Sequence, residues 1–542
     1  MALRRVASLA LARALSGPAA PPAGLNWRES SCKAAEHVER TRARLRVCVV
    51  GAGPAGFYAV DKLLRAVDRG VAPADTRIAV VDALPHPGGL VRSGVAPDHP
   101  EVKVATHKAD AVLADPRVEF IGNVRVGGSG KGEIHIRRDL LGQNSVCGFH
   151  AVIVATGAAE DDRKLGVPGE EDKLAARGEP GPRQVLSARE ISSWYNGRPG
   201  ADALAPLLSP APSGTAVVIG AGNVALDVGR VLLKGRSGLL DGTDAPGYAL
   251  DALRGSNIRR VLIVARKGPT HVKITPKELR EVLALAETSG IRVRTLDSDF
   301  AFVTPEDEEN AAQRSRAQSR TFALLRDKAE RIGEAMARAP GVDAAASNDE
   351  LCFFFHRKPV AIERDESGSV KGIQLSWTGA SPGSRENEFV PADLVVRSVG
   401  YLGQALPGVP FDTNGGVVPT SGGRILTATG GVPVPGLYAA GWIKRGPTGI
   451  IATNVECAAE TVSSLLADVR TLLPEEEGQG PDSISTLRAL LAERAIQVVD
   501  FDGWQRVQAE EARRGALQGR PADKLTDLEA ILRVASPAQE TL

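Results

Sequence analysis

Several features that would assign a chain of 542 residues to a common class are scarce or missing here. The five cysteines lie far apart, and the absence of any CxxC or CxxxxC pair argues against a disulfide relay, a zinc ribbon and an iron–sulfur ligand set. We therefore expect no protein-bound metal. Lys plus Arg (66) nearly balances Asp plus Glu (65), so the total charge does not favour nucleic-acid binding. No run of about 18 apolar residues occurs, so no transmembrane segment is predicted.

The N-terminus lacks acidic residues until Glu29 and carries Arg4, Arg5 and Arg13 among Ala, Leu and Ser. This composition is typical of a mitochondrial transit peptide, and Arg13 interrupts the apolar core that a secretory signal would need. We expect residues 1–40 to be a transit peptide with a flexible lead, which would place the protein in the mitochondrial matrix. A tail without an address and a plastid address are the alternatives.

What the chain does contain is an alternation of β-branched runs and helical patterns. The runs "LRVCVV", "TRIAVV", "HAVIVA", "TAVVI" and "RRVLIVA" predict buried strands, and helical periodicity follows the glycine turns. This order predicts an α/β fold with parallel, doubly wound sheets. Residues 306–338 read as helical, and so does the tail from 483 to 542, which we expect to cover a face of the molecule.

The first glycine turn, "GAGPAG", has Gly51, Gly53 and Gly56 at G-x-G-x-x-G spacing between a strand and a helix. The first glycine allows the tight turn, the second admits a pyrophosphate and the third lets the helix pack on the strand. Asp82 closes the second strand, where a carboxylate can accept hydrogen bonds from a ribose. These residues predict a dinucleotide site, although the spacing alone does not separate FAD from NAD.

The second turn, "GAGNVA", has Gly220 and Gly222, with Ala225 in place of the third glycine. The strand after it ends in Arg266 and Lys267, two cations that would attract the 2′-phosphate of NADP(H) where an acid would repel it. The interval from Gly220 is longer than the roughly 20 residues of the compact fingerprint. The alternative is that Arg266 and Lys267 are merely a solvated strand end.

Longer stretches carry a resemblance to a known family. "VVGAGPAGFY", "GLVRSGVAPDHPEVK", "GAGNVALDV", "KELRE" and "GWIKRGPTGIIAT" resemble the NADPH:adrenodoxin oxidoreductases, the mitochondrial ferredoxin–NADP reductases, within the flavoprotein disulfide-reductase-like superfamily. The resemblance spans residues 46–455. It implies two Rossmann-like domains, with an NADP-binding domain (151–400) inserted into an FAD-binding domain (46–150 and 401–542, the latter including the C-terminal helices).

The resemblance also implies cofactor contacts at named positions. For FAD these are Gly51, Gly53, Ala55, Gly56, Asp82, Leu90, Val126, Trp442, Gly449, Ile450 and Ile451. For NADP(H) they are Gly220, Ala221, Gly222, Asn223, Val224, Arg266, Lys267, Glu278 and Gly449. The family usually has Arg-Arg where this chain has Arg266-Lys267, so the phosphate geometry there is expected to differ.

The implied activity is electron transfer from NADPH through FAD to an acidic [2Fe–2S] ferredoxin of the adrenodoxin type, which would serve cytochrome P450 reactions or iron–sulfur cluster assembly. His99 and Asp227 are expected to approach across the domain seam, as a proton relay or as an interdomain tether. Arg280, Arg316 and Arg320, with Arg314 beside them, match the family's basic docking positions. A solvated helix face is the alternative for these arginines.

Other functions stay open at this point. A flavoprotein with a different acceptor, such as a quinone or a glutamate-synthase-like partner, would share both glycine turns. A nucleotide-binding scaffold or sensor without catalysis would share them too. The resemblance allows peripheral association with the inner mitochondrial membrane.

Overall fold

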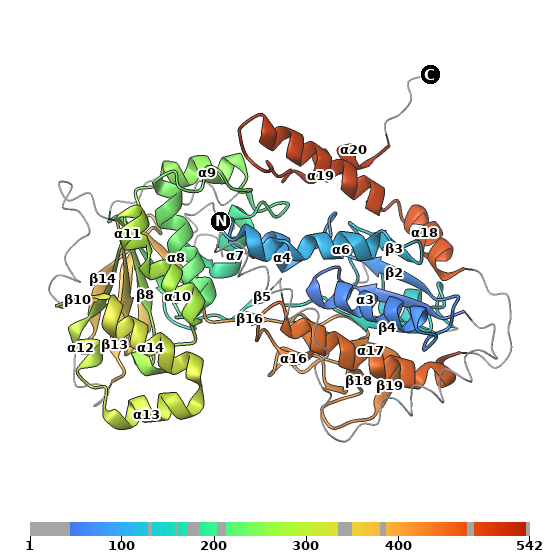
Figure 1. The fold of residues 1–542 in the computed structure, drawn as a ribbon, viewed down its shortest axis with the longest axis horizontal. Coiled ribbons are helices and arrows are strands. Elements are labelled where there is room, and N and C mark those ends of the chain that lie inside the picture. The colour runs from blue at the N-terminus through green and yellow to red at the C-terminus, as the bar shows by residue number, and fades with distance from the viewer. Residues whose placement is uncertain are drawn as a thin grey trace.

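The computed structural model describes residues 44–127, 133–142, 144–158, 161–171, 184–202, 213–333, 349–379, 386–473 and 482–537. The predicted transit peptide lies outside these residues. The described chain forms two α/β domains that lie side by side, and helices near the C-terminus extend along both of them (Figure 1). Among the described residues, no helix has both the length and the apolar character needed to cross a membrane.

The first domain is built on a seven-stranded sheet of order β17-β18-β19-β4-β1-β2-β3. Strands β1, β2, β3, β4 and β19 are parallel, and β17 and β18 join them as an antiparallel edge. Alternate residues of β1 enter opposite cores, since Val47 and Val49 pack toward one face and Cys48 and Val50 toward the other. The strand is therefore buried on both faces, as its uninterrupted apolar run predicts. The bounds are β1 Arg46–Val50, β2 Arg77–Val81, β3 Val118–Ile121, β4 Ala151–Val154, β17 Thr420–Ser421, β18 Arg424–Leu426 and β19 Pro433–Ala439.

The second domain has a parallel seven-stranded sheet of order β10-β9-β11-β8-β7-β15-β6. Strand β7 of this sheet alternates in the same way: Ala216 and Val218 face the helices, while Val217 and Ile219 face a small antiparallel sheet, β12-β13-β14. The predicted α/β class is confirmed, but strands rather than helices cover this second face. The bounds are β6 Val185–Ser187, β7 Thr215–Ile219, β8 Arg260–Val264, β9 Arg292–Leu296, β10 Glu330–Ile332, β11 Glu350–Phe354, β12 Arg357–Arg364, β13 Val370–Trp377, β14 Glu388–Pro391 and β15 Leu394–Arg397.

Helices complete both domains. In the first domain they are α3 Pro54–Asp68, α4 Leu90–Ser93, α5 Pro100–Lys103, α6 Ala105–Leu113, the π-helix η1 Ile136–Leu140, α16 Trp442–Arg445, α17 Thr453–Leu472 and α18 Ser483–Glu493. In the second they are α7 Ala188–Tyr195, α8 Asn223–Arg236, α9 Gly247–Arg254, the 3-10 helix η4 Pro269–His271, α10 Pro276–Leu283, α11 Leu285–Ser289, α12 Asp297–Phe300, α13 Pro305–Arg314 and α14 Arg316–Lys328. The C-terminal pair is α19 Phe501–Ala516 and α20 Leu528–Ala535.

The chain crosses between the domains twice, and the two crossings pair with each other. One follows β4 and contains β5 (Asp161–Asp162); the other follows β15 and contains β16 (Tyr401–Leu402). These strands form a two-stranded antiparallel ladder between the two large sheets (Figure 1). The carboxyl ends of β4 and β15 are thus tied together by two short hydrogen-bonded linkers.

Two sequence-based expectations are wrong in detail. The boundary at residues 150/151 separates β4 from the domain to which it belongs, because β4 pairs with β1 and β19 in the first sheet. The stretch 306–338 is not one helical region: α14 ends at Lys328 and β10 follows it. A run such as "AVIV" predicts a buried strand equally well in either sheet, so local pattern does not reveal its partners.

The segment from 500 to 537, here called the C-terminal strap, contacts both domains. On the first domain, Arg92 forms an ion pair with Glu511 at 2.6 Å, and the Trp504 indole lies 3.4 Å from Asp110. On the second domain, Arg520 donates to the backbone oxygen of Ala245 at 2.6 Å. Because its anchors lie on different domains, the strap restrains their relative movement.

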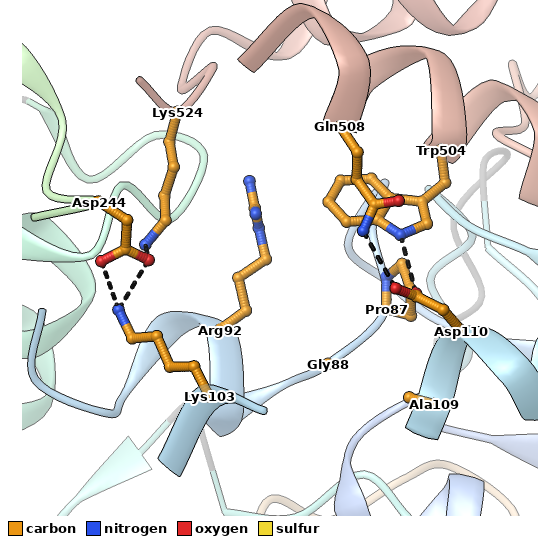
Figure 2. Close-up of a pocket in the computed structure, with 10 residues that line it drawn as sticks. All are labelled: Pro87, Gly88, Arg92, Lys103, Ala109, Asp110, Asp244, Trp504, Gln508 and Lys524. Atoms are coloured by element: carbon orange, nitrogen blue, oxygen red, sulfur yellow. Dashed lines mark hydrogen bonds and ion pairs between the residues drawn. The ribbon is translucent and has the colours of Figure 1, made fainter. Parts of the chain in front are cut away.

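The strap and the two domains meet around a cavity of about 110 Å³. At this cavity Asp244, from the loop between α8 and α9, receives Lys103 at 2.6 Å and Lys524 at 2.9 Å (Figure 2). Burial opposes ionisation of Asp244, but the two ammonium groups hold its pKa down at about 2. Burial lowers the pKa of Lys524 to about 7. A single carboxylate therefore joins the first domain, the second domain and the strap.

Asp244→Asn is expected to destabilise the protein, because it leaves the Lys103 and Lys524 ammonium groups buried without their shared carboxylate. The loss in the free energy of unfolding should be about 3 kcal/mol, as found when one partner of a buried pair is removed. Asp241→Asn in the same loop is the control, since its ion pair with Arg254 is roughly half exposed and should contribute less than about 1 kcal/mol. Urea unfolding measures both, and equal losses would contradict the joining role of Asp244.

Candidate functional site

The first glycine turn lies where the order of the first sheet reverses, between β1 and β4. Gly51 has φ +111°, and a Cβ on it would lie 2.5 Å from the Ala155 backbone oxygen. A Cβ on Gly56 would collide with the Gly51 carbonyl, so the third glycine allows helix and turn to pack together. By contrast, a Cβ on Gly53 would meet nothing closer than 3.8 Å. The open space therefore lies before the N-terminus of α3, where a pyrophosphate fits.

Asp82 has a structural role in this turn. Its carboxylate accepts the backbone N–H of Ala52 at 2.6 Å and that of Leu84 at 2.8 Å, so it fixes the glycine turn to the end of β2. The residue fits the predicted ribose contact and also supports the turn.

The residues implied to contact the flavin come from distant parts of the chain, and several meet at this turn. Gly441, which precedes α16, packs against Ala55, and the loop before Leu90 passes over Gly53. Trp442 stacks on Tyr401 of the linker strand β16, with 5.7 Å between ring centroids. Val126 is buried in the core beneath the carboxyl ends of β1 and β2.

The loop with Gly449, Ile450 and Ile451 is largely exposed, and Arg445 anchors it. The Arg445 guanidinium donates to the Thr453 hydroxyl at 2.9 Å and to the Asn454 side chain at 3.0 Å. Gly449 has φ +84°, and a Cβ on it would lie 2.5 Å from the Thr453 hydroxyl oxygen. This loop is therefore held open toward solvent by a fixed cation.

The second glycine turn repeats the geometry of the first between β7 and β15. Gly220 has φ +116° and lies against the Ser398 backbone, while a Cβ on Gly222 would meet no atom within 4 Å. Ala225 is fully buried at the third position. The Asn223 side chain accepts the Thr275 backbone N–H at 2.9 Å, which fixes the start of α10 beside the turn. Ala221 and Val224 pack on the helical core of this domain.

Charge distinguishes the two turns. The strand after the first ends at the carboxylate of Asp82, and the strand after the second ends at Arg266 and Lys267, whose side chains are exposed. Within the described residues, no carboxylate lies in ion-pair distance of either cation. The first site thus offers acceptors for a ribose, and the second offers cations for an additional phosphate.

His99 and Asp227 both lie at the seam between the domains, but each forms its hydrogen bond or ion pair with another residue. His99 Nε2 lies 2.8 Å from Glu281 Oε2, and Asp227 accepts from Arg230 at 2.8 Å. His99 and Asp227 lie on opposite sides of the seam near each other, as expected, but no hydrogen bond joins them in the described part of the chain. Arg230 lies between them, 3.5 Å from His99 Nδ1.

Arg230 connects the two domains. Its side chain is 2% exposed, and it donates to Asp98 of the first domain at 2.8 and 3.1 Å. Lys234 reaches the same carboxylate at 2.8 Å. The Glu278 carboxylate lies 3.8 Å from Arg230, and its buried Oε2 has no hydrogen-bond partner among the described residues. That free acceptor fits the predicted cofactor contact of Glu278.

The electrostatics of the seam follow from burial and from these charges. Burial opposes the charge on His99, but its hydrogen bond to Glu281 and the nearby Asp227 and Asp98 raise the pKa of the imidazole above its usual value. Burial also raises the pKa of Asp227. Burial disfavours ionised Asp98, yet Arg230 and Lys234 hold its pKa well below the usual range.

Sequence reasoning missed three members of this seam: Asp98, Arg230 and Glu281. Asp98 precedes His99 in "APDHP", and Arg230 follows Asp227 by one helical turn, so both are adjacent to residues that were identified. A charged residue on the apolar face of α8 was the available signal for Arg230. Glu281 had no local signal, since its partner is 182 positions away in the chain.

The three predicted docking arginines lie on two helices that pack together. Arg280 is on α10, and Arg316 and Arg320 are on α14; the Thr321 hydroxyl joins α14 to the Ile274 carbonyl, just before α10, at 2.9 Å. All three side chains are exposed. Arg314 ends α13, and its guanidinium is directed to Thr270 and His271.

Comparison with known proteins decides the family. The sequence pattern of the family described as "Pyridine nucleotide-disulphide oxidoreductase" matches residues 45–316. The mitochondrial NADPH:adrenodoxin oxidoreductase of Arabidopsis thaliana is 39% identical over 506 residues, covering 91% of this chain and 95% of its own. The Homo sapiens protein of that name is 36% identical, covering 95% and 96%. This chain belongs to the adrenodoxin oxidoreductase family.

Comparison with a solved structure supports the two-domain fold. Mycobacterium tuberculosis FprA in complex with NADPH has a TM-score of 0.75 and 34% identity, with 91% of this chain and 99% of FprA covered. The expected resemblance and the expected two-domain α/β fold are thus confirmed. As an adrenodoxin oxidoreductase family member, the chain is an oxidoreductase that uses FAD and NADP(H), and the two glycine turns are the candidate sites for these two dinucleotides.

His99→Gln should destabilise the seam in a pH-dependent way. The folded pKa of His99 is raised, so its contribution is fully present below the unfolded value of about 6.5 and is lost as pH rises through the folded pKa. The melting-temperature difference between wild type and His99→Gln should therefore be largest near pH 6 and shrink above it. Glu281→Gln should show the same profile.

Glu101→Gln is the matched control, because Glu101 pairs with Lys277 at a position where both side chains are more than half exposed. It should leave the pH profile of the melting temperature unchanged. A His99→Gln difference that is independent of pH would show that the imidazolium does not stabilise the seam.

Proposed function

We propose that this chain is a mitochondrial NADPH-dependent flavoprotein that reduces an acidic [2Fe–2S] ferredoxin. The main support is the difference in charge between the two glycine turns. The strand that follows the first turn ends at the acidic Asp82, and the strand that follows the second ends at the basic Arg266 and Lys267. FAD is assigned to the first turn and NADPH to the second. The relatives' printed names, NADPH:adrenodoxin oxidoreductase and NADPH-ferredoxin reductase, support a ferredoxin as acceptor.

The chain's own residues would bind and position the two dinucleotides. The open space at Gly53 and at Gly222 fits one pyrophosphate each, at the positive ends of α3 and α8. Trp442 and residues 449–451 would border the flavin, and Glu278 would accept from the NADPH side of the seam. When bound, FAD takes two electrons together from NADPH and delivers them one at a time, which a one-electron acceptor requires.

We infer that His99 and Asp227 act as part of an interdomain tether. Each is held by a charged partner from the seam, Glu281 for His99 and Arg230 for Asp227. Both cofactor turns lie directly beside the linkers that join the domains, so the seam sets the distance between the cofactors. In this assignment Arg230 and Asp98 are positioning residues.

The docking face is assigned to Arg280, Arg316 and Arg320. None of the three forms an ion pair with another described residue, whereas Arg326 on the same α14 pairs with Glu308 at 3.1 Å. Free arginines on two packed helices suit an acidic protein surface.

The mitochondrial names of the relatives and the arginine-rich N-terminus support a matrix location, with peripheral inner-membrane association as an extension of the proposal. Supply of electrons to P450 chemistry or to iron–sulfur cluster assembly would follow.

The function is tested by anaerobic titration of the purified yellow protein with NADPH and, separately, with NADH. NADPH should bleach the flavin absorbance at a much lower concentration than NADH, because Arg266 and Lys267 favour the 2′-phosphate. Addition of an oxidised acidic [2Fe–2S] ferredoxin should then restore the absorbance. Bleaching by NADPH without reoxidation by ferredoxin, but with reoxidation by a quinone, would favour the alternative acceptor.

Arg280→Glu should raise the KM for ferredoxin by about tenfold or more, because an acidic side chain would face an acidic partner. NADPH-dependent ferricyanide reduction should be unchanged, since this small acceptor needs no docking surface. Both rates are measured at low ionic strength, where surface charges are least screened. Lys328→Glu, at the far end of α14, is the control. Equal loss of both activities in Arg280→Glu would remove Arg280 from the docking face.

A further inference from the structure

The cations at the end of β8 have neighbours that the sequence did not place there. After Arg266 and Lys267 the chain forms η4, which ends at His271, and the last residue of α13, Arg314, faces it. Arg314 Nη1 lies 3.3 Å from His271 Nε2, and its Nη2 donates to the Thr270 carbonyl at 3.3 Å. Arg314 therefore belongs to this corner of the second domain rather than to the docking arginines of α10 and α14.

Positive charge at this corner is not compensated within the described residues. Both Lys267 and Arg314 are exposed, and no carboxylate of a described residue lies in ion-pair distance of either. Asp307 faces the corner from α13, but its carboxylate accepts from the Thr304 backbone and hydroxyl at 3.0 and 2.9 Å. A group of cations without a counterion indicates a site for an anion.

The protonation state of the His271 ring is affected by the same positive charge. A guanidinium only donates, so Nε2 must accept from Arg314, and the ring proton is then on Nδ1, 3.1 Å from the Thr270 hydroxyl. Burial, Arg314 and Lys267 together lower the pKa of His271, and Asp307 opposes them weakly. His356, from the turn between β11 and β12, is the other titratable group nearby, and His271 contributes to lowering its pKa.

We propose that His271 and Arg314 join Arg266 and Lys267 in the subsite for the 2′-phosphate of NADPH, and that His271 takes up a proton from solvent when the phosphate binds. The proposal rests on the assignment of NADPH to the second glycine turn. A phosphate oxygen replaces the imidazole nitrogen as acceptor for Arg314. His271 Nε2 is then free to bind a proton and to donate a hydrogen bond to the same phosphate. The negative charge of the phosphate offsets the repulsion between the protonated imidazole and the neighbouring cations. Binding specificity for NADPH over NADH thereby becomes linked to pH.

Isothermal titration calorimetry on the FAD-containing protein tests this with two probes, 2′,5′-ADP and 5′-AMP, which differ only by the 2′-phosphate. Titrations at about pH 6.5 in buffers of different ionisation enthalpy count the protons taken up on binding. The 2′-phosphate itself releases protons on binding, so the quantity compared is the difference in proton uptake between wild type and His271→Gln. Wild type should take up close to one proton more per 2′,5′-ADP than His271→Gln, and the two should not differ for 5′-AMP.

Arg314→Gln should weaken binding of 2′,5′-ADP about tenfold, as loss of one charge-assisted hydrogen bond implies, and leave binding of 5′-AMP unchanged. Lys328→Gln, an exposed cation on the adjacent helix α14, should change neither affinity. Equal proton uptake in wild type and His271→Gln, or equal weakening of both probes by Arg314→Gln, would overturn the proposal while leaving the NADPH assignment intact. Failure of wild type to prefer 2′,5′-ADP over 5′-AMP would instead overturn that assignment, and the proposal with it.

Discussion

The buried guanidinium of Arg230 is the interaction on which the seam between the two domains depends. It is 2% exposed, and the carboxylates of Asp98, Asp227 and Glu278 surround it. A cation this deeply buried is stable only with nearby negative charge, and Asp98 supplies part of that charge from the other domain. The second domain therefore has an electrostatic reason to remain against the first. His99 and Glu281 extend the same network toward the cofactor turns.

Two further connections act with this network. The linkers β5 and β16 pair with each other directly beyond the carboxyl ends of β4 and β15, and the C-terminal strap spans both domains through Glu511 and Lys524. Each glycine turn lies at the edge where its sheet reverses order, next to one of the linkers. A rotation at the linkers would therefore change the distance between the two glycine turns and leave each turn intact.

Arginines of similar sequence context take different roles in the tertiary structure. Arg314, Arg316 and Arg320 are near neighbours in the chain, yet the break between α13 and α14 directs Arg314 to His271 and leaves the other two exposed beside Arg280. A nearly neutral protein thus keeps the exposed arginines of α10 and α14 apart from the cations at the end of β8. The separation results from one residue, Ser315, whose extended backbone ends one helix and caps the next.

The sequence by itself determined the two glycine turns, the buried strands around them, the opposite charges at Asp82 and Arg266, and the family. These features are local, since a turn, a strand and a strand end are specified by neighbouring residues. Only the tertiary structure decided that β4 belongs to the first sheet, that His99 pairs with Glu281, and that Arg230 joins the domains. Those contacts link positions more than 100 residues apart. They depend on the path of the chain between the elements, which periodicity and spacing do not encode.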